Sequence, residues 1–378
     1  MSLTGFLFPG VMHMTCNAQK QISKFACFAV AIFVMSGILS VFAQEKISPL
    51  SDYQYKKDFP QYDAIKKEPD AQKRADALLA FIKARQVSRT MRYAAADYLA
   101  CVKPLLDQKD WAKAIAMEET LLAALPTPDT VKAAGIPDGA VPGAADFIKD
   151  DLLPTQKTVL SSLAGLYIQS QNWPKAAEIA EKIYALAPDK TLLPQIADIY
   201  LKFNVDKYLT YGQKILAEFS MEQSYGTALQ MAQVYIQKQD LAAAIDLLTK
   251  VMDVYGEKVP VNVPEQQWNA TRAFAYGVIV SPVYQKKDYP KALELYEKVV
   301  KFDPKKDDVY YYIGMCKWQT KDQEGAIDAF AKAVVLNNKT LAPRAKQYLE
   351  ELYKAQHSGS LDGLDQILAK AKADLGIG

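Results

Sequence analysis

One short pattern occurs three times in this chain with the same internal spacing. A polar residue and an aromatic residue come first, a lysine and an alanine follow, and a proline stands 12 residues after that alanine. A polar N-cap residue starts a helix, and proline ends one because its nitrogen cannot donate the next hydrogen bond. The copies are Asp110-Trp111-Ala112-Lys113-Ala114 with Pro126, Asn172-Trp173-Pro174-Lys175-Ala176 with Pro188, and Asp288-Tyr289-Pro290-Lys291-Ala292 with Pro304. This spacing predicts the second helix of a recurring helical hairpin.

Six versions of the hairpin can be followed along the chain, starting near residues 95, 157, 190, 225, 273 and 307. The version near 157 is the most complete, with Leu160, Leu163 and Tyr167 in its first helix and Ala176 in its second. The version near 190 is the most degenerate, because Leu209 stands where the alanine belongs. Each apolar set recurs at helical spacing, so one face of every helix needs a neighbour to bury it, and stacked hairpins supply that neighbour.

In this spacing, with its small residue for close helix crossing and its terminating proline, the chain resembles the tetratricopeptide repeat (TPR) family. The resemblance implies an all-α fold, a right-handed α-solenoid of stacked helical hairpins known as a TPR superhelix. It also implies that a partner binds in a concave groove lined by the first helices. The alternative is an unrelated helical bundle, which has no reason to keep a repeat near 34 residues.

The repeat spacing also predicts the organisation of the chain. We expect an array of about six repeats over residues 87–340, with insertions near 127–154 and 256–267, because the alanine spacing is longer there. Either insertion could contact a partner, although simple length variation is the plainer reading. Residues 341–378 are expected to form capping helices whose outer faces carry Lys370, Lys372 and Asp374.

The segment between residues 44 and 86 has a different composition from the repeats. Pro49, Pro60 and Pro69 alternate with charged residues in its first part, which predicts an extended lead-in with at most a short helix. From Asp70 an amphipathic pattern continues to Arg85. That second part is expected to be half of a partial first repeat.

An N-terminal segment over residues 1–43 predicts export. Residues 25–43 are an unbroken run of apolar and small residues, preceded by Lys20 and Lys24 and followed by Gln44. A basic start, an apolar middle and a small-residue end are typical of a cleaved signal peptide. The run has 19 residues, close to the length of about 20 that spans a bilayer, so a retained membrane anchor is the alternative. Both readings place the repeats outside the cytosol, either periplasmic or secreted, or anchored by residues 25–43.

The same segment accounts for the positive charge of the chain, which is formally +2. Residues 1–43 contain Lys20 and Lys24 and no acid, so the remainder has 43 basic and 43 acidic side chains. Nucleic-acid binding and basic membrane patches need clustered Lys and Arg. We therefore expect no nucleic-acid partner, and membrane contact only through an uncleaved N-terminal segment.

No pattern of catalytic or metal-binding residues stands out. Cys101 and Cys316 fall in first helices of distant repeats, so separate buried thiols are expected. His357 is the only histidine beyond residue 43 and stands in a polar stretch typical of a helix end. Adjacent carboxylates such as Asp150 and Asp151 point away from each other on a helix. The sequence therefore predicts a protein that is not an enzyme and that needs no metal and no cofactor.

Groove-facing positions follow from the repeat register. In the later repeats they are Gly226, Leu229, Gln233, Phe274, Gly277, Ser281, Tyr311, Tyr312 and Met315. Glutamine also recurs at one equivalent place, and aromatic residues gather near the C-terminal end of the array. The candidate partner-binding residues are Gln169, Gln237, Tyr284, Gln285, Tyr311, Tyr312, Trp318 and Gln319. A glutamine amide can both donate to and accept from a peptide backbone, but polar residues at exposed helix ends are an equally good reading.

Two classes of function remain. The favoured one is a non-enzymatic scaffold or adaptor of the cell envelope that binds another protein or peptide in the groove. The alternative is a carrier or accessory subunit for a nonprotein ligand such as a polysaccharide, because aromatic rings can stack on sugars. The oligomeric state does not follow from the sequence.

Overall fold

The computed structural model describes residues 51–134, 136 and 142–377, and every regular element in these ranges is a helix. The chain divides into two compact units, unit 1 up to Tyr208 and unit 2 from Leu209. The predicted signal or anchor and the first cysteines, Cys16 and Cys27, lie outside the described residues. In the part of the chain that the structure describes, no helix is long and apolar enough to cross a membrane.

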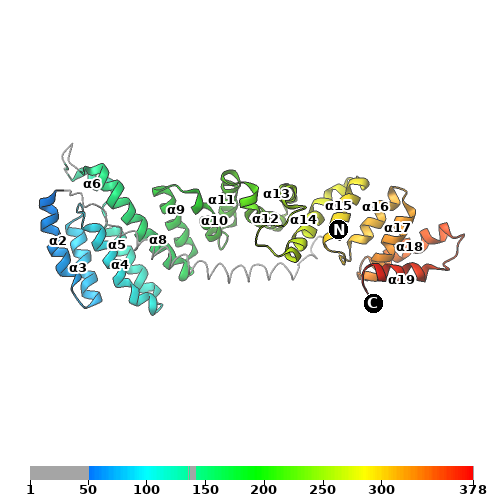
Figure 1. The fold of residues 1–378 in the computed structure, drawn as a ribbon, viewed down its shortest axis with the longest axis horizontal. Helices are drawn as coiled ribbons and strands as arrows, with labels where there is room; N and C mark the ends of the chain where they lie inside the picture. Colours follow the sequence, from blue (N-terminus) through cyan, green and yellow to red (C-terminus); the bar gives the residue numbers. More distant parts are fainter. Residues whose placement is uncertain (1–50, 135, 137–141, 378) are drawn as a thin grey trace. The chain divides into compact units, whose positions relative to one another are not determined.

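Unit 1 is a row of helices in which successive helices pack on one another (Figure 1). Four hairpin helices precede the first insertion, and three further helices follow it. The elements are α2 (Asp52–Lys66), α3 (Ala71–Ala84), α4 (Met91–Asp107), α5 (Trp111–Ala124), α6 (Pro128–Ala133), α7 (Ala144–Phe147), the π-helix η1 (Ile148–Leu152), α8 (Leu153–Gln169), α9 (Trp173–Leu186), the 3-10 turn η2 (Lys190–Leu192) and α10 (Leu193–Tyr200). Helix α5 packs directly on α8, so the insertion does not interrupt the stack.

Unit 2 continues the same construction. Helix α11 (Val205–Glu218) begins just before the boundary between the units. The following elements are α12 (Met221–Gln237), α13 (Leu241–Tyr255), α14 (Glu265–Gln285), α15 (Tyr289–Phe302), α16 (Val309–Gln319), α17 (Gln323–Leu336), α18 (Ala342–Gln356) and α19 (Leu364–Asp374). From α12 to α18 each helix packs on the next one. The chain is therefore an all-α solenoid built from stacked helical hairpins.

Five hairpins are closed by the same turn. The residue before each N-cap adopts a left-handed conformation, with φ between 58° and 68° at Lys109, Gln171, Gln239, Lys287 and Lys321. In the α8–α9 turn the amide of Asn172 donates to the carbonyl of Tyr167 over 2.8 Å. The side chain of Asn172 in turn accepts from the amide of Lys175 over 3.3 Å. These bonds satisfy the end of one helix and the start of the next.

In the five hairpins that share this turn, an alanine stands at the position that the repeat pattern assigns to the helix crossing, while the α10–α11 hairpin has Leu209 there. The five alanines that open the motif are fully buried, and they are Ala114, Ala176, Ala244, Ala292 and Ala326. In the α16–α17 hairpin a glycine also stands in close contact with the second helix, because a Cβ added to Gly314 would lie 2.7 Å from the ring of Phe330. Small residues at these points let the two backbones approach.

The prediction of an extended lead-in is wrong for residues 52–66, which form α2. Ser51 caps this helix by accepting from the amide of Gln54 over 3.1 Å. The carboxylate of Asp58 is buried and binds Arg85 over 2.9 Å and the Ser88 hydroxyl over 2.6 Å. These contacts come from the turn between α3 and α4. They stabilise α2 even though Pro60 removes one of its hydrogen bonds.

The two insertions differ in structure. In the first, α6, α7 and η1 occupy much of the stretch expected to be turn-rich, and the side chains of Phe147 and Leu152 are fully buried. In the second, residues 256–264 contain a tight turn in which the Val263 amide donates to the Pro260 carbonyl over 3.2 Å. That turn exposes 84% of Val261 to solvent. The first insertion therefore belongs to the core of unit 1, and the second projects from unit 2.

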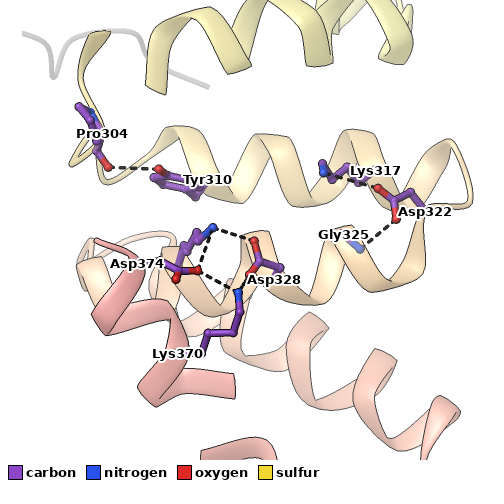
Figure 2. Close-up of polar contacts among 9 residues, drawn as sticks. Pro304, Tyr310, Lys317, Asp322, Gly325, Asp328, Lys370 and Asp374 are labelled. Carbon is purple, nitrogen blue, oxygen red and sulfur yellow. Dashed lines mark hydrogen bonds and ion pairs between the residues drawn. The ribbon is translucent and has the colours of Figure 1, made fainter. Parts of the chain in front are cut away.

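The last helix is held by charges that the sequence places on an outer face. Lys370 of α19 lies 3.4 Å from Asp328 of α17 and 2.9 Å from Asp374 (Figure 2). Lys332 of α17 lies 3.6 Å from Asp374. Lys370 and Asp374 stay exposed, and they also join α19 to α17. These ion pairs form because α19 packs on α17, and sequence spacing within α19 does not specify that neighbour.

Candidate binding surface

The four glutamines of the predicted site share one position in their hairpins. Gln169, Gln237, Gln285 and Gln319 are the last residues of α8, α12, α14 and α16, and all four side chains are exposed. Each stands directly before the shared left-handed turn. This is the arrangement expected for polar residues at exposed helix ends, so the glutamines follow from the turn and need no ligand to explain them.

Tyr311 does not lie on an open face. Only 9% of it is exposed, and its ring lies 6.0 Å from Phe330 and 6.3 Å from Tyr348 between ring centroids. These partners come from α17 and α18, so Tyr311 belongs to the core between three helices. Successive residues of a helix point about 100° apart, and the packing of α18 decides which of them is covered. The prediction of Tyr311 as a groove residue is therefore corrected.

Tyr284 and Tyr312 are half-buried and belong to one aromatic cluster. The ring of Tyr312 stacks on buried Tyr296 with centroids 5.5 Å apart, and Tyr284 meets Tyr312 edge to face at 5.2 Å. Burial raises the pKa of both Tyr284 and Tyr312 above the ordinary value, so their hydroxyls stay neutral near pH 7. Both residues keep part of their surface exposed.

Trp318 is also half-buried, and it lies six residues after Tyr312 on α16. Its ring contacts Tyr348 of α18 at a centroid distance of 5.3 Å. The structure thus brings Tyr284, Tyr312 and Trp318 to partly exposed positions of unit 2. The fourth predicted aromatic residue, Tyr311, lies in the core.

Two exposed glycines point to a binding surface, although the list of candidate partner-binding residues did not include them. Gly226 of α12 and Gly277 of α14 are exposed, and a Cβ built on either would meet nothing within 4 Å. Glycine inside a helix costs about 0.5–1 kcal/mol relative to alanine. At Gly314 the crossing with Phe330 explains the glycine, but at Gly226 and Gly277 packing within the chain does not.

The first helices of three hairpins of unit 2, α12, α14 and α16, carry the groove-facing positions, and we call the surface that these positions form the A-helix face of unit 2. They recur at intervals of three or four on α12, α14 and α16, which places them along one stripe of each helix. All ten are uncharged, and they are Gly226, Leu229, Gln233, Phe274, Gly277, Ser281, Tyr284, Tyr312, Met315 and Trp318. The face combines partly exposed apolar rings with two open stretches of backbone.

Two shallow depressions lie on the described helices of unit 1. One of about 480 Å³ lies between α3 and α5 and is lined by Lys83, Ala116 and Ala123. The second, of about 240 Å³, is bounded by α5, α8 and α9, with Leu163 and Tyr167 in its wall. Both are lined mainly by second helices of hairpins, which the sequence did not predict as a binding surface.

Side chains suited to metal binding or catalysis are sparse among the described residues of both units. No group of three metal-ligating side chains occurs in the described ranges. Cys101 and Cys316 are buried free thiols, and burial raises the pKa of Cys316 to about 12. His357 ends α18 and stacks on Tyr353 with ring centroids 3.8 Å apart. Burial in the core explains the two cysteines, and the helix end explains His357.

Comparisons with known proteins agree with this architecture. Residues 283–346 match the family model described as Tetratricopeptide repeat. A comparison with curated proteins gives no match. Among solved structures, the yeast Sti1 TPR2AB domain in a pHSP90 complex is 12% identical, covering 80% of this chain and 100% of that chain with a TM-score of 0.34. MamA of AMB-1 is 18% identical, covering 50% and 97% with a TM-score of 0.34.

These two structures are only loosely superposable on this chain, so the assignment depends on the repeats. The matched residues run from the end of α14 to the start of α18. They include two of the five shared turns, those at Lys287 and Lys321, and the whole α16–α17 hairpin. No enzyme family is indicated. The matched repeat and the common hairpin geometry identify this chain as a tetratricopeptide repeat protein, with the fold of a protein-interaction scaffold.

Proposed function

We propose that this protein is a non-enzymatic scaffold of the cell envelope that binds another protein along the A-helix face of unit 2. The observation that carries the proposal is the pair of open glycines, Gly226 and Gly277. A partner's backbone can approach a helix closely where no side chain projects. The half-buried rings of Tyr284, Tyr312 and Trp318 offer contact area beside them, and aromatic anchors commonly dominate interfaces.

The charge of the face indicates the chemistry of the partner. None of its ten positions carries Lys or Arg, so the face itself supplies no cation for a terminal carboxylate; Arg344 of α18 is the cation that acts on Tyr312 at its edge. Partly exposed Leu229, Phe274 and Met315 favour apolar contacts instead. The expected partner is an uncharged, apolar peptide segment or helix face with small residues where it crosses the glycines.

The envelope location comes from the sequence of the N-terminal segment. An apolar run behind two lysines, followed by small residues, is typical of exported proteins. We therefore expect the partner to be another protein outside the cytosol, with membrane contact only if residues 25–43 remain as an anchor.

Site-specific photocrosslinking in the native cells tests the binding face. A photoreactive phenylalanine analogue at Phe274, which lies on the same face three residues before Gly277, is expected to give a discrete protein adduct. The same analogue at Ala242, which is exposed on α13, is the control and should give none. Replacing Trp318 by alanine should reduce the Phe274 adduct. Equal adducts at both positions, or a Phe274 adduct unaffected by Trp318→Ala, would contradict the assignment of the face.

A carrier for a saccharide is the second candidate. It is favoured by the partly exposed faces of Tyr284, Tyr312 and Trp318, since aromatic rings can stack on sugar rings. The same experiment separates the two, because a saccharide adduct would survive exhaustive proteolysis of the crosslinked product and a protein adduct would not.

A further inference from the structure

Glu118 occupies a position that three hairpins of unit 2 fill with large apolar residues, while the α9 hairpin has Ala180 there. It stands four residues after the crossing alanine Ala114 on α5. The corresponding residues of α13, α15 and α17 are Leu248, Tyr296 and Phe330, and all three are buried. Glu118 is just as buried, with 1% of its surface exposed. A carboxyl group therefore replaces a core side chain at one joint of the stack.

The carboxyl group is incompletely bonded. Its Oε1 accepts from the Ser162 hydroxyl of α8 over 2.8 Å, while its Oε2 is buried and has no hydrogen-bond partner. Among the described residues no basic side chain forms an ion pair with it. A buried carboxylate without a cation is costly, so burial favours the neutral acid. This burial raises the pKa of Glu118 to about 7, and the Ser162 bond only partly opposes the shift.

The groups around Glu118 do not supply a compensating charge. Helix α4 contributes Tyr98, whose hydroxyl donates to the Met117 carbonyl over 3.1 Å and whose pKa is raised to about 12 by burial. Helix α8 contributes the uncharged Ser162. On α5 itself, the neighbouring Glu119 is exposed and accepts from the hydroxyl of Tyr167.

Helix α3 also packs on α5, and two of its charged groups act on this region, Asp76 on Tyr98 of α4 and Lys83 beside α5. Asp76 lies close enough to Tyr98 to raise the pKa of that hydroxyl. Lys83 lines the surface depression beside Glu119, and its amine is exposed. Neither group pairs with Glu118.

We propose that the contact between α5 and α8 is a proton-sensitive joint, packed when Glu118 is neutral and loosened when Glu118 is ionised. This inference is independent of the A-helix face, which belongs to the other unit. The depression bounded by α5, α8 and α9 crosses the same joint, since Glu119 lies on one side of it and Leu163 on the other. Proton concentration would therefore control the shape of that surface.

The direction of the effect follows from the raised pKa. The folded protein binds the proton more tightly than the unfolded chain, in which the pKa of this glutamate has its ordinary value of 4.5. Stability supplied by the neutral acid is complete below that value and is lost as pH rises through about 7. We therefore expect the contact between α5 and α8 to loosen as the pH rises through about 7.

Hydrogen exchange followed by mass spectrometry tests the joint in the full chain. After correction for intrinsic exchange rates, amides of α5 and α8 should exchange about tenfold faster near pH 8 than near pH 6, the factor by which the neutral fraction falls around a pKa of 7. Glu118→Gln keeps an acceptor for Ser162 but cannot ionise, so its corrected exchange should be the same at both pH values.

Two further variants keep the test decisive. Glu119→Gln changes the exposed neighbour and should retain the tenfold response of the parent. Glu118→Leu supplies an apolar residue, as in the three hairpins of unit 2, and should remove the response even if the glutamine variant folds poorly. A parent chain without the pH response, or a leucine variant that retains it, would overturn the proposal.

Discussion

Tyr312 stacks on Tyr296 with ring centroids 5.5 Å apart and planes inclined by only 9°. Tyr296 belongs to α15 and is buried, whereas Tyr312 belongs to α16 and keeps part of its surface exposed. The contact therefore links the second helix of one repeat to the first helix of the next. It also holds one edge of the A-helix face in place.

The corrected placement of Tyr311 predicts a clear difference between neighbouring aromatic residues. Tyr311→Ala should lower the free energy of unfolding by about 3–5 kcal/mol, because it empties the space between Phe330 and Tyr348. Trp318→Ala should instead weaken binding to the crosslinked partner at least tenfold, or about 1.4 kcal/mol. Chemical denaturation and titration with the partner measure the two effects. A Trp318 variant that loses stability but binds normally would show that this ring is structural.

Two glycines of unit 2, Gly277 and Gly314, should show opposite changes in stability when each is replaced by alanine. Gly277→Ala adds a methyl group in open space, so it should stabilise α14 by about 0.5–1 kcal/mol. Gly314→Ala should destabilise the protein, because its Cβ would lie 2.7 Å from the Phe330 ring. Thermal melts of the two variants check this. If Gly277→Ala lowers the melting temperature, its surroundings are not open in solution.

Overpacking a helix crossing should be costly in unit 1. Ala176→Leu introduces a larger side chain at a fully buried crossing, and overpacking of this kind costs about 1–3 kcal/mol. Ala112→Leu, at an exposed position of α5, is the control and should change stability by less than about 0.5 kcal/mol. Equal melting temperatures for the Ala176 variant and the parent would contradict the close crossing of α8 and α9.

The buried carboxyl group predicts how stability varies with pH. Because burial raises the pKa of Glu118 to about 7, the parent should lose stability as pH rises from about 5 to about 8. Glu118→Gln should recover up to about 3 kcal/mol near pH 8, on the order of the shift between the unfolded and folded pKa. Denaturant titrations at several pH values check this slope. Parallel curves for the parent and the variant would exclude an ionising Glu118.

The N-terminal segment predicts processing at one bond. If residues 1–43 are a cleaved signal, the exported protein should begin at Gln44. N-terminal sequencing of the protein from the extracytoplasmic fraction checks this. Recovery of the uncleaved chain with the membranes would favour the anchor instead.

Local chemistry determined the repeats, and so they could be predicted from the sequence. The N-cap Asn172 and the closing Pro188 act through neighbouring backbone groups, so they specify where a helix begins and ends. The regular spacing of Ala176 from both marks where that helix crosses its partner. The same local rules place the four glutamines at helix ends. For that reason, the all-α fold could be predicted without knowing which helix packs on which.

Tertiary packing decided the features that the sequence missed. Pro60 lies within a helix because Asp58 reaches Arg85 and Ser88, which are distant in the sequence. Tyr311 is buried because its ring lies between Phe330 of α17 and Tyr348 of α18. The pKa of Glu118 is raised because the packing of α8 and its neighbours on α5 buries the carboxyl group. Periodicity along one helix shows which residues share a side. Only the packing of neighbouring helices decides which side loses its water, and with it the exposure and the charge of each group.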